Sequence, residues 1–303
     1  MAFLFSGGNS SESARILKFL CEHGGSTGAC FWFLEDREQN LREIGRRGVR
    51  LWTAFSGKGT AETIFHQIGI LMQDKGCDGL WTTKFSVDKK ASALDVLKAM
   101  PGESCIFDDL LKLLTPEDWQ NIEDMKPPQK ATAHERQQAY TRIGAYLMQY
   151  SYKCFSEKCS CRRHGKDCPL WDSSDIAEAL TVSMVGSICK AFSSRGKHER
   201  ESSENTMPYH VWVALMRFLQ PAVAFHEITP TAPADRMLER DLGDIYRINS
   251  TKVCPTRIGH PHTRERIVSA LHHKRKASYT GSWEEMWQIL GASVDLSGVS
   301  YES

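Results

Sequence analysis

From residue 49 onward, short apolar segments that read as strands alternate with segments of helical spacing. Residues 49–55 form the first such strand, and apolar residues then recur every three or four positions across residues 60–74. This alternation predicts parallel βαβ units, because each helix returns the chain to the start of the next strand. We therefore expect an α/β protein with a mostly parallel sheet flanked by helices. Further strands are expected at residues 80–87, 104–107, 181–187 and 222–225.

The residues at the carboxyl ends of these expected strands are a glycine, three acidic residues and a cysteine. In order along the chain they are Gly57, Asp88, Asp109, Cys189 and Glu227. In an open parallel sheet, the carboxyl ends of the strands line the ligand crevice. We therefore expect these five residues to lie around one site.

The turn after the first strand, Phe55-Ser-Gly-Lys-Gly59, indicates a ligand that approaches the backbone closely. An acid after the next strand, here Asp88, can hold two ribose hydroxyls. The glycine spacing differs from the Gly-x-Gly-x-x-Gly and Walker patterns, so neither NAD nor ATP is favoured. S-adenosylmethionine, a nucleoside without phosphate, fits the pattern better. The alternative is an ordinary tight turn without a ligand.

Cys189 is the candidate nucleophile of this site. Lys190, Arg195 and Lys197 follow it along the chain. Nearby cations lower the pKa of a thiol and raise the fraction of reactive thiolate. The alternative is a buried cysteine that acts as a small apolar residue.

A second group of thiols lies within residues 154–168. Its members are Cys154, Cys159, Cys161, His164 and Cys168. Four thiolates, or three thiolates and the imidazole, can close a tetrahedral zinc shell. The alternative is an exposed basic loop of free thiols. Because the N-terminus has no basic segment followed by a long apolar one, we expect no signal peptide and a reducing compartment for the ten cysteines.

Charge and hydropathy narrow the choice of partners. The chain has 38 Lys and Arg against 37 Asp and Glu, which gives a formal net charge of +1. Binding to a nucleic acid must therefore come from local basic patches rather than from the net charge. No apolar run approaches the ~20 residues that span a bilayer, so no membrane partner is expected.

Six segments between residues 54 and 268 resemble those of one enzyme family. Residues 186–196, with the sequence Gly-Ser-Ile-Cys-Lys-Ala-Phe-Ser-Ser-Arg-Gly, resemble the Pro-Cys-Gln-Gly-Phe-Ser-x-x-Gly segment of cytosine-5 DNA methyltransferases. Residues 220–229 resemble their Lys-Pro…Glu-Asn-Val strand, and residues 259–268 resemble their Gly-x-Pro-Gln-x-Arg-x-Arg segment. Residues 54–59, 87–91 and 107–110 are similar to the family's cofactor loop and the next two strand ends. All six segments occur in the family's order.

The resemblance implies a Rossmann-like, S-adenosylmethionine-dependent methyltransferase fold over residues 49–271. Residues 1–48 are then an N-terminal extension, residues 154–168 a Cys/His-rich insert, and residues 272–303 a short segment in place of a full target-recognition domain. The implied location is the nucleus of a eukaryote, or otherwise the cytoplasm.

The resemblance also implies a reaction, in which the methyl group passes from S-adenosylmethionine to C5 of cytosine in DNA. Cys189 would add to C6 of a flipped cytosine, and Glu227 would hydrogen-bond the N3/N4 edge of the ring. Arg264 and Arg266 would position Glu227 and a target phosphate. The residues expected to bind the cofactor are Phe55, Ser56, Gly57, Gly59, Asp88, Lys89, Asp109 and Leu110. Those expected to contact the nucleic acid are Ser193, Arg195, Gly196 and Lys197.

The chain departs from the family pattern at several points. Thr53 stands where an acid usually opens the cofactor loop, and Ile188 stands where a proline usually precedes the cysteine. Because the expected recognition region is very short, three alternatives stay open. They are the same chemistry on RNA such as tRNA, an adaptor that binds nucleic acid or a partner methyltransferase without catalysis, and a piece of a larger enzyme whose other part recognises the target.

Overall fold

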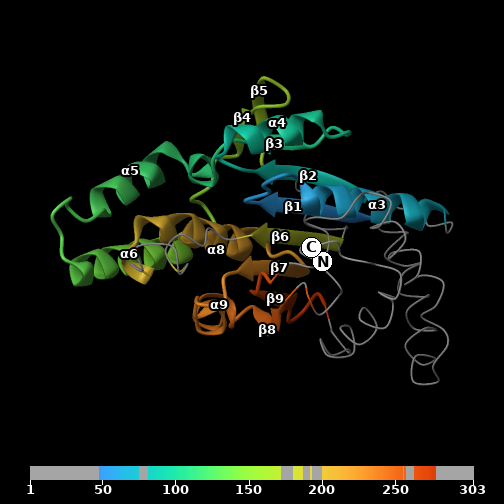
Figure 1. The fold of residues 1–303 in the computed structure, drawn as a ribbon. Coiled ribbons are helices and arrows are strands. Elements are labelled where there is room, and N and C mark those ends of the chain that lie inside the picture. Colours follow the sequence, from blue (N-terminus) through green and yellow to red (C-terminus); the bar gives the residue numbers. More distant parts are fainter. Residues whose placement is uncertain are drawn as a thin grey trace, which may run out of the picture.

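A seven-stranded sheet forms the centre of the molecule (Figure 1), with the strand order β3-β2-β1-β6-β7-β9-β8. The computed structural model describes residues 48–74, 81–171, 180–186, 192, 200–254, 256 and 263–277. The strands are β1 (Val49–Ala54), β2 (Trp81–Val87), β3 (Cys105–Phe107), β6 (Leu180–Gly186), β7 (Val223–Ile228), β8 (Tyr246–Val253) and β9 (Arg266–His273). The first five pair in parallel, and β9 pairs antiparallel with both β7 and β8. The expected fold class, a Rossmann-like, mostly parallel sheet flanked by helices, is confirmed.

Helices connect the parallel strands and cover the sheet (Figure 1). They are α3 (Thr60–Asp74), α4 (Ala91–Ala99), α5 (Pro116–Met125), α6 (Ala133–Gln149), α8 (Met207–Leu219) and α9 (Ala234–Leu242). The expected helix at residues 60–74 follows β1, and α4 follows β2, as the alternation predicts. Short 3-10 turns lie at η2 (Leu110–Leu113), η4 (Arg200–Ser202) and η5 (Glu204–Thr206). A separate two-stranded hairpin is formed by β4 (Lys158–Cys161) and β5 (Lys166–Pro169).

The main core lies where α8 packs against α6 and the sheet. Nine of the thirteen residues of α8 are buried, which is typical of a helix that is covered on more than one side. Trp212 of α8 is fully buried and stacks on the ring of His226 of β7, with 5.1 Å between the ring centroids. His226 is therefore a core residue, and its neighbour Glu227 points to the opposite face of β7. Within the part of the chain that the structure describes, no helix combines the length and apolarity needed to cross a membrane.

Candidate active site

The turn between β1 and α3, residues 55–59 (the glycine turn), has an unusual backbone. Phe55, Gly57 and Gly59 all have positive φ, at 56°, 58° and 70°. A Cβ on Gly57 would meet no atom within 4 Å, so open space lies beside the turn, and the glycine serves its left-handed backbone. A Cβ on Gly59 would clash with the sulfur of Met100, so this glycine also lets α3 approach the end of α4 closely.

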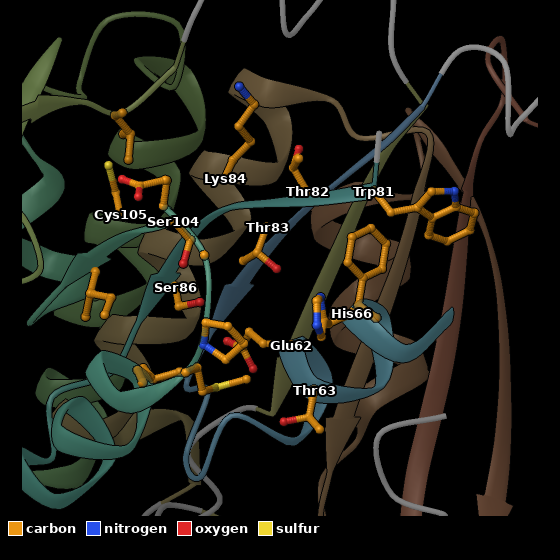
Figure 2. Close-up of a pocket in the computed structure, with 18 of the residues that line it drawn as sticks. Glu62, Thr63, His66, Trp81, Thr82, Thr83, Lys84, Ser86, Ser104 and Cys105 are labelled. Atoms are coloured by element: carbon orange, nitrogen blue, oxygen red, sulfur yellow. The ribbon is translucent and has the colours of Figure 1, made fainter. Parts of the chain in front are cut away.

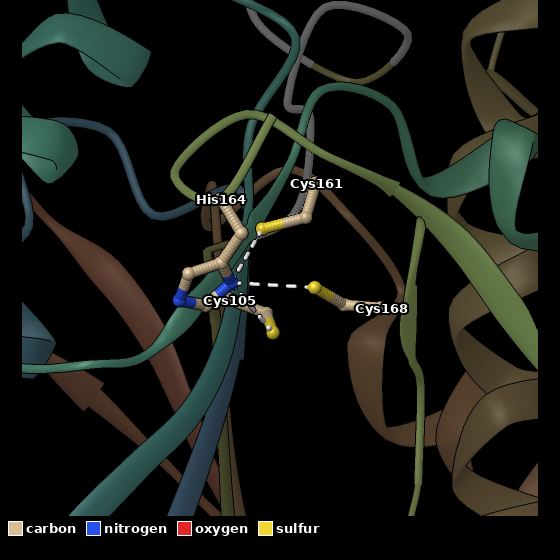
Figure 3. A group of neighbouring side chains, drawn as sticks. All are labelled: Cys105, Cys161, His164 and Cys168. Carbon is tan, nitrogen blue, oxygen red and sulfur yellow. Dashed lines mark hydrogen bonds between the residues drawn. The ribbon is translucent and has the colours of Figure 1, made fainter. Parts of the chain in front are cut away.

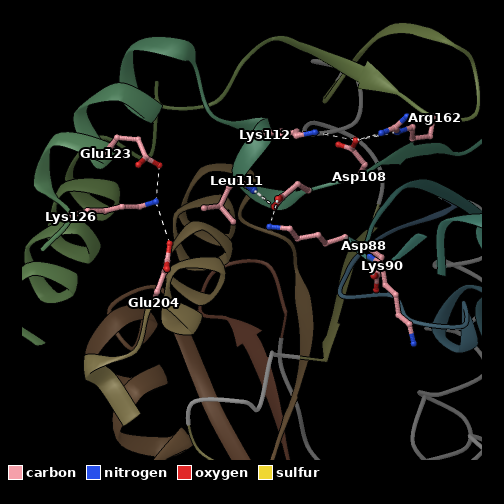
Figure 4. A network of polar contacts seen from close by, with 11 residues as sticks. Asp88, Lys90, Asp108, Leu111, Lys112, Glu123, Lys126, Arg162 and Glu204 are labelled. Atoms are coloured by element: carbon pink, nitrogen blue, oxygen red, sulfur yellow. Dashed lines mark hydrogen bonds and ion pairs between the residues drawn. The ribbon is translucent and has the colours of Figure 1, made fainter. Parts of the chain in front are cut away.

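Asp88, which follows β2, holds the glycine turn in place. Its Oδ2 accepts a hydrogen bond from the N–H of Gly57 at 2.7 Å, and its Oδ1 accepts one from the N–H of Lys90 at 2.8 Å (Figure 4). The carboxylate therefore joins the ends of β1 and β2. The predicted contact between Asp88 and a ribose stays a prediction.

Asp109 lies at the end of β3 and joins the same edge of the sheet. Its Oδ1 caps η2 by accepting from the N–H of Leu111 at 3.0 Å, and its Oδ2 pairs with Lys89 Nζ at 3.2 Å. Leu110 is buried in the core. The structure therefore brings the glycine turn, Asp88 and Asp109 to one edge of the sheet, with Lys89 as the residue that connects the last two. Their role in binding a cofactor stays a prediction.

Glu227, near the end of β7, forms an ion pair with Arg266. Its Oε1 is 2.6 Å from Arg266 Nε, and each side chain is only 15% exposed. Burial raises the pKa of Glu227 to about 7, and the charges of Arg266 and Arg264 only partly oppose this effect. Near neutral pH this carboxyl group is thus present in both protonation states, which suits a side chain that donates a proton or a hydrogen bond.

Gly186, at the end of β6, brings Glu227 close to the glycine turn. Gly186 pairs with Glu227 in the sheet, and a Cβ on Gly186 would lie 3.3 Å from Glu227 Oε2 and 3.8 Å from the carbonyl oxygen of Phe55. Cys189 stands three positions further along the chain. Cys189 and the four predicted nucleic-acid contacts, Ser193, Arg195, Gly196 and Lys197, lie outside the described residues.

The two predicted arginines occupy different positions. Arg266 is the first residue of β9 and touches Glu227 directly. Arg264 is exposed and acts on Glu227 only through its charge. The difference follows from the register of β9 against β7, which pairs Ile267 with Ile228 and so starts the strand beside the glutamate.

Sequence reasoning missed Glu62, in the first turn of α3. Its carboxylate accepts a hydrogen bond from Thr53 Oγ1, and Thr53 Oγ1 in turn lies 2.7 Å from Ser56 Oγ in the glycine turn. Glu62 is 4% exposed, and its Oε2 has no hydrogen-bond partner among the described residues. An acid therefore stands beside Thr53, the position where the family pattern has one. The signal in the sequence was an acid three residues after Gly59.

A cavity of about 530 Å³ opens beside β2, between α3 and α4. Figure 2 shows Glu62 and His66 of α3 and Thr83 of β2 among the side chains that line it. Its lining does not include Asp88, Asp109 or Glu227. The cavity therefore adjoins the glycine turn through Glu62 but is distinct from the predicted crevice at the strand ends.

The cysteine group is rearranged relative to the sequence expectation. The structure brings Cys161, His164 and Cys168 together with Cys105 of β3. Cys154 and Cys159 do not join them: their buried thiols lie 4.0 Å and 3.9 Å from the carbonyl oxygens of Ser151 and Ser156.

Comparisons with known proteins give only distant likenesses. No protein-family model and no curated protein matches the sequence. Among solved structures, the S. pombe Dnmt2 methyltransferase aligns at 10% identity and a TM-score of 0.40, over 79% of this chain and 53% of that one. The Entamoeba histolytica methyltransferase EhMeth aligns at 12% identity and a TM-score of 0.43, over 78% of this chain and 55% of that one. A mutant of the Spodoptera frugiperda DNMT2 aligns at 12% identity and a TM-score of 0.39, over 75% of this chain and 51% of that one. The chain thus spans about half the length of these proteins, and likenesses of this degree do not identify a reaction.

Proposed function

We propose that this protein transfers a methyl group from S-adenosylmethionine to C5 of cytosine in DNA, through a covalent adduct on Cys189. The observation that carries the proposal is the placement of Glu227. This buried carboxyl group, with a pKa of about 7, faces the strand end of Gly186. Cys189 follows Gly186 by three positions in the sequence. The proposed nucleophile thus comes after β6, the strand that pairs with the β7 strand of the proposed acid.

The residues can carry each step of this reaction. The Cys189 thiolate adds to C6 of the ring. The π pair of the C5=C6 double bond moves to C4–C5, and that of the C4=N3 double bond moves to N3, which takes the proton of the Glu227 carboxyl. The resulting enamine makes C5 nucleophilic. When bound, S-adenosylmethionine supplies an electrophilic methyl group for C5 and leaves as S-adenosylhomocysteine. Loss of the C5 proton to water then re-forms the C5=C6 double bond and expels the Cys189 thiolate, and N3 returns its proton to Glu227. Arg266 keeps Glu227 oriented throughout.

The strand ends suit a cationic nucleoside better than a phosphate. Asp88 and the buried Glu62 place two carboxyl groups beside the glycine turn, and Asp109, paired with Lys89, lies further along the same edge of the sheet. Such a cluster attracts a sulfonium and an ammonium group and repels a pyrophosphate. The open space beside Gly57 leaves room for a ligand next to the backbone. The residues that would hold the cofactor are therefore the glycine turn, Asp88 and Asp109.

The target base has to leave the DNA stack to reach this edge of the sheet. The two faces of a paired cytosine ring are covered by the stacked neighbouring bases, so the base must be flipped out before Cys189 can attack C6. Arg195 and Lys197, which follow Cys189 along the chain, have the charge needed to hold the flanking phosphates. Ser193 and Gly196 offer a hydroxyl and a backbone N–H for the same purpose.

Replacement of Asp88 tests the cofactor assignment. Asp88→Ala is expected to weaken binding of S-adenosylhomocysteine by roughly 1–3 kcal/mol, because it leaves the Gly57 N–H and a polar group of the ligand without their partner. Isothermal titration calorimetry measures the affinity. Asp95→Ala removes an exposed carboxylate of α4 and should bind like the wild type. Equal affinities for Asp88→Ala and the wild type would remove Asp88 from the site.

Covalent trapping tests the reaction as a whole. An oligonucleotide with 5-fluorocytosine cannot lose its C5 substituent as a proton, so a competent enzyme with S-adenosylmethionine should stay attached to it. We expect a complex with duplex DNA that survives denaturing electrophoresis. A complex that forms with RNA but not with DNA would identify RNA as the substrate. If the protein bound S-adenosylhomocysteine normally but formed no complex with either nucleic acid, the proposed catalysis would be wrong and a non-catalytic adaptor would be favoured.

A further inference from the structure

Four metal-binding side chains meet beside the start of β3 (Figure 3). Cys105 begins β3, Cys161 ends β4, His164 lies in the hairpin turn, and Cys168 belongs to β5. The Nδ1 atom of His164 is 3.7 Å from Cys105 Sγ, 3.4 Å from Cys161 Sγ and 3.3 Å from Cys168 Sγ. All four ligand atoms lie within 4.8 Å of one another.

Hydrogen bonding alone does not account for this arrangement. The Nδ1 atom of an imidazole carries either one hydrogen or one lone pair, so it can satisfy only one of the three thiols. A metal ion satisfies all of them. Tetrahedral zinc, with Zn–S of ~2.3 Å and Zn–N of ~2.0 Å, places neighbouring nitrogen and sulfur ligands ~3.5 Å apart. The three distances between His164 and the sulfur atoms, 3.3 to 3.7 Å, bracket this value.

The surroundings of the four residues are also those of a metal site. The backbone N–H of Ile106 donates to Cys161 Sγ at 3.3 Å, a contact that stabilises a thiolate. The other ring nitrogen of His164, Nε2, lies 3.8 Å from the Glu103 carboxylate. A carboxylate on the far side of the imidazole is the usual means of orienting a histidine ligand.

The hairpin that supplies three of these residues needs an anchor. Among the described strands, β4 and β5 pair only with each other. They have four residues each, and a hairpin of this size is marginally stable by itself. It is fixed to β3 by Arg162, whose N–H donates to the Ile106 carbonyl at 2.7 Å and whose guanidinium binds Asp108 at 2.5 Å (Figure 4). Asp108 directly precedes Asp109, so the hairpin also supports the edge of the candidate active site.

We propose that Cys105, Cys161, His164 and Cys168 bind one structural Zn²⁺ that fastens the β4–β5 hairpin to β3. Three thiolates and one imidazole fill a tetrahedral shell and leave no open position, so the ion has a structural and not a catalytic role. Soft thiolate ligands with an imidazole favour zinc over magnesium or calcium. Binding releases the thiol protons to solvent. The site stands on its own geometry and does not depend on the proposed methyl transfer.

Metal analysis of the purified full chain tests the site. We expect about one equivalent of zinc in the wild type, as a closed four-ligand site requires, and a loss of more than nine-tenths of it in Cys105→Ala and in Cys161→Ala. Cys159→Ala is the matched control, because Cys159 is also buried on β4 but lies outside the group. It should retain the zinc. Retention of zinc by Cys105→Ala together with its loss from Cys159→Ala would overturn the ligand assignment.

A second measurement stays informative if the alanine variants fail to fold. Cobalt(II) added to wild-type protein after removal of zinc should give the visible bands of a tetrahedral thiolate site. His164→Cys should still bind cobalt, with a spectrum changed by the fourth sulfur. Chelation of the wild type should lower its melting temperature, because metal binding is coupled to folding. A wild type that holds no zinc and gives no cobalt bands would overturn the proposal.

Discussion

Cys189→Ser is expected to abolish covalent trapping on 5-fluorocytosine. The thiolate is the attacking species, and a serine hydroxyl at neutral pH has almost no ionised form, so addition to C6 should fall below detection. Affinity for S-adenosylhomocysteine should stay at the wild-type level, because the glycine turn and Asp88 belong to β1 and β2, whereas Cys189 follows β6. Denaturing electrophoresis of labelled DNA measures the first property, and calorimetry the second.

Cys254 provides the matched control for this variant. Its thiol lies 3.0 Å from Thr256 Oγ1 just after the end of β8, and hydrogen bonds from Thr256 lower its pKa, which favours the thiolate. Cys254→Ser should trap as the wild type does. The opposite pattern, trapping by Cys189→Ser and none by Cys254→Ser, would transfer the role of nucleophile to Cys254 and end the assignment made from the family resemblance.

The position of the residues at the carboxyl ends of β1, β2 and β3 could be predicted, because the sequence patterns that indicate them are local. A strand, a glycine turn and a helix leave their pattern in consecutive residues, and parallel βαβ units bring successive strand ends to one side. Asp88 and Asp109 needed no further information to be placed beside Gly57. The antiparallel pair β8 and β9 was not predicted. β9 pairs with β7, and β8 pairs with β9, so the place of both strands in the sheet depends on contacts between segments that are distant in the sequence. The pattern of residues 259–268 indicates a motif rather than the start of a strand.

The ligands of the zinc site show where local spacing stops being a guide. Cys154, Cys159, Cys161 and Cys168 all lie within one 15-residue segment, so the sequence does not distinguish them as ligands. In the structure, only Cys161 and Cys168 of these four lie close to His164. Cys105 completes it from β3, far away in sequence, because Arg162 and the Ile106 carbonyl hold the hairpin against that strand. Such a contact is a property of the tertiary structure. The same holds for Glu62, whose link to Thr53 depends on how α3 packs on β1.

The protonation state of Glu227 sets the last expectation. Since burial raises its pKa to about 7, the protonated form that can donate to N3 disappears as the pH rises through that value. The rate of trapping at subsaturating DNA should therefore fall above pH 7, toward tenfold per pH unit, once the thiolate of Cys189 is fully formed. Glu227→Gln offers a hydrogen bond but no proton. It should be slower by ~10²-fold or more, the scale of a positioned acid, and should lack the decline at high pH.

A neighbouring carboxylate separates this effect from a general loss of charge. Glu265 is exposed and pairs with Lys252 at 2.7 Å, close to Arg266 but not in contact with Glu227. Glu265→Gln should keep both the wild-type rate and the decline at high pH. Glu227→Gln should keep its affinity for S-adenosylhomocysteine, which shows that the fold is intact. If Glu227→Gln trapped DNA at the wild-type rate with the same pH profile, the acid would have to be another group, and the ion pair with Arg266 would be only a part of the sheet.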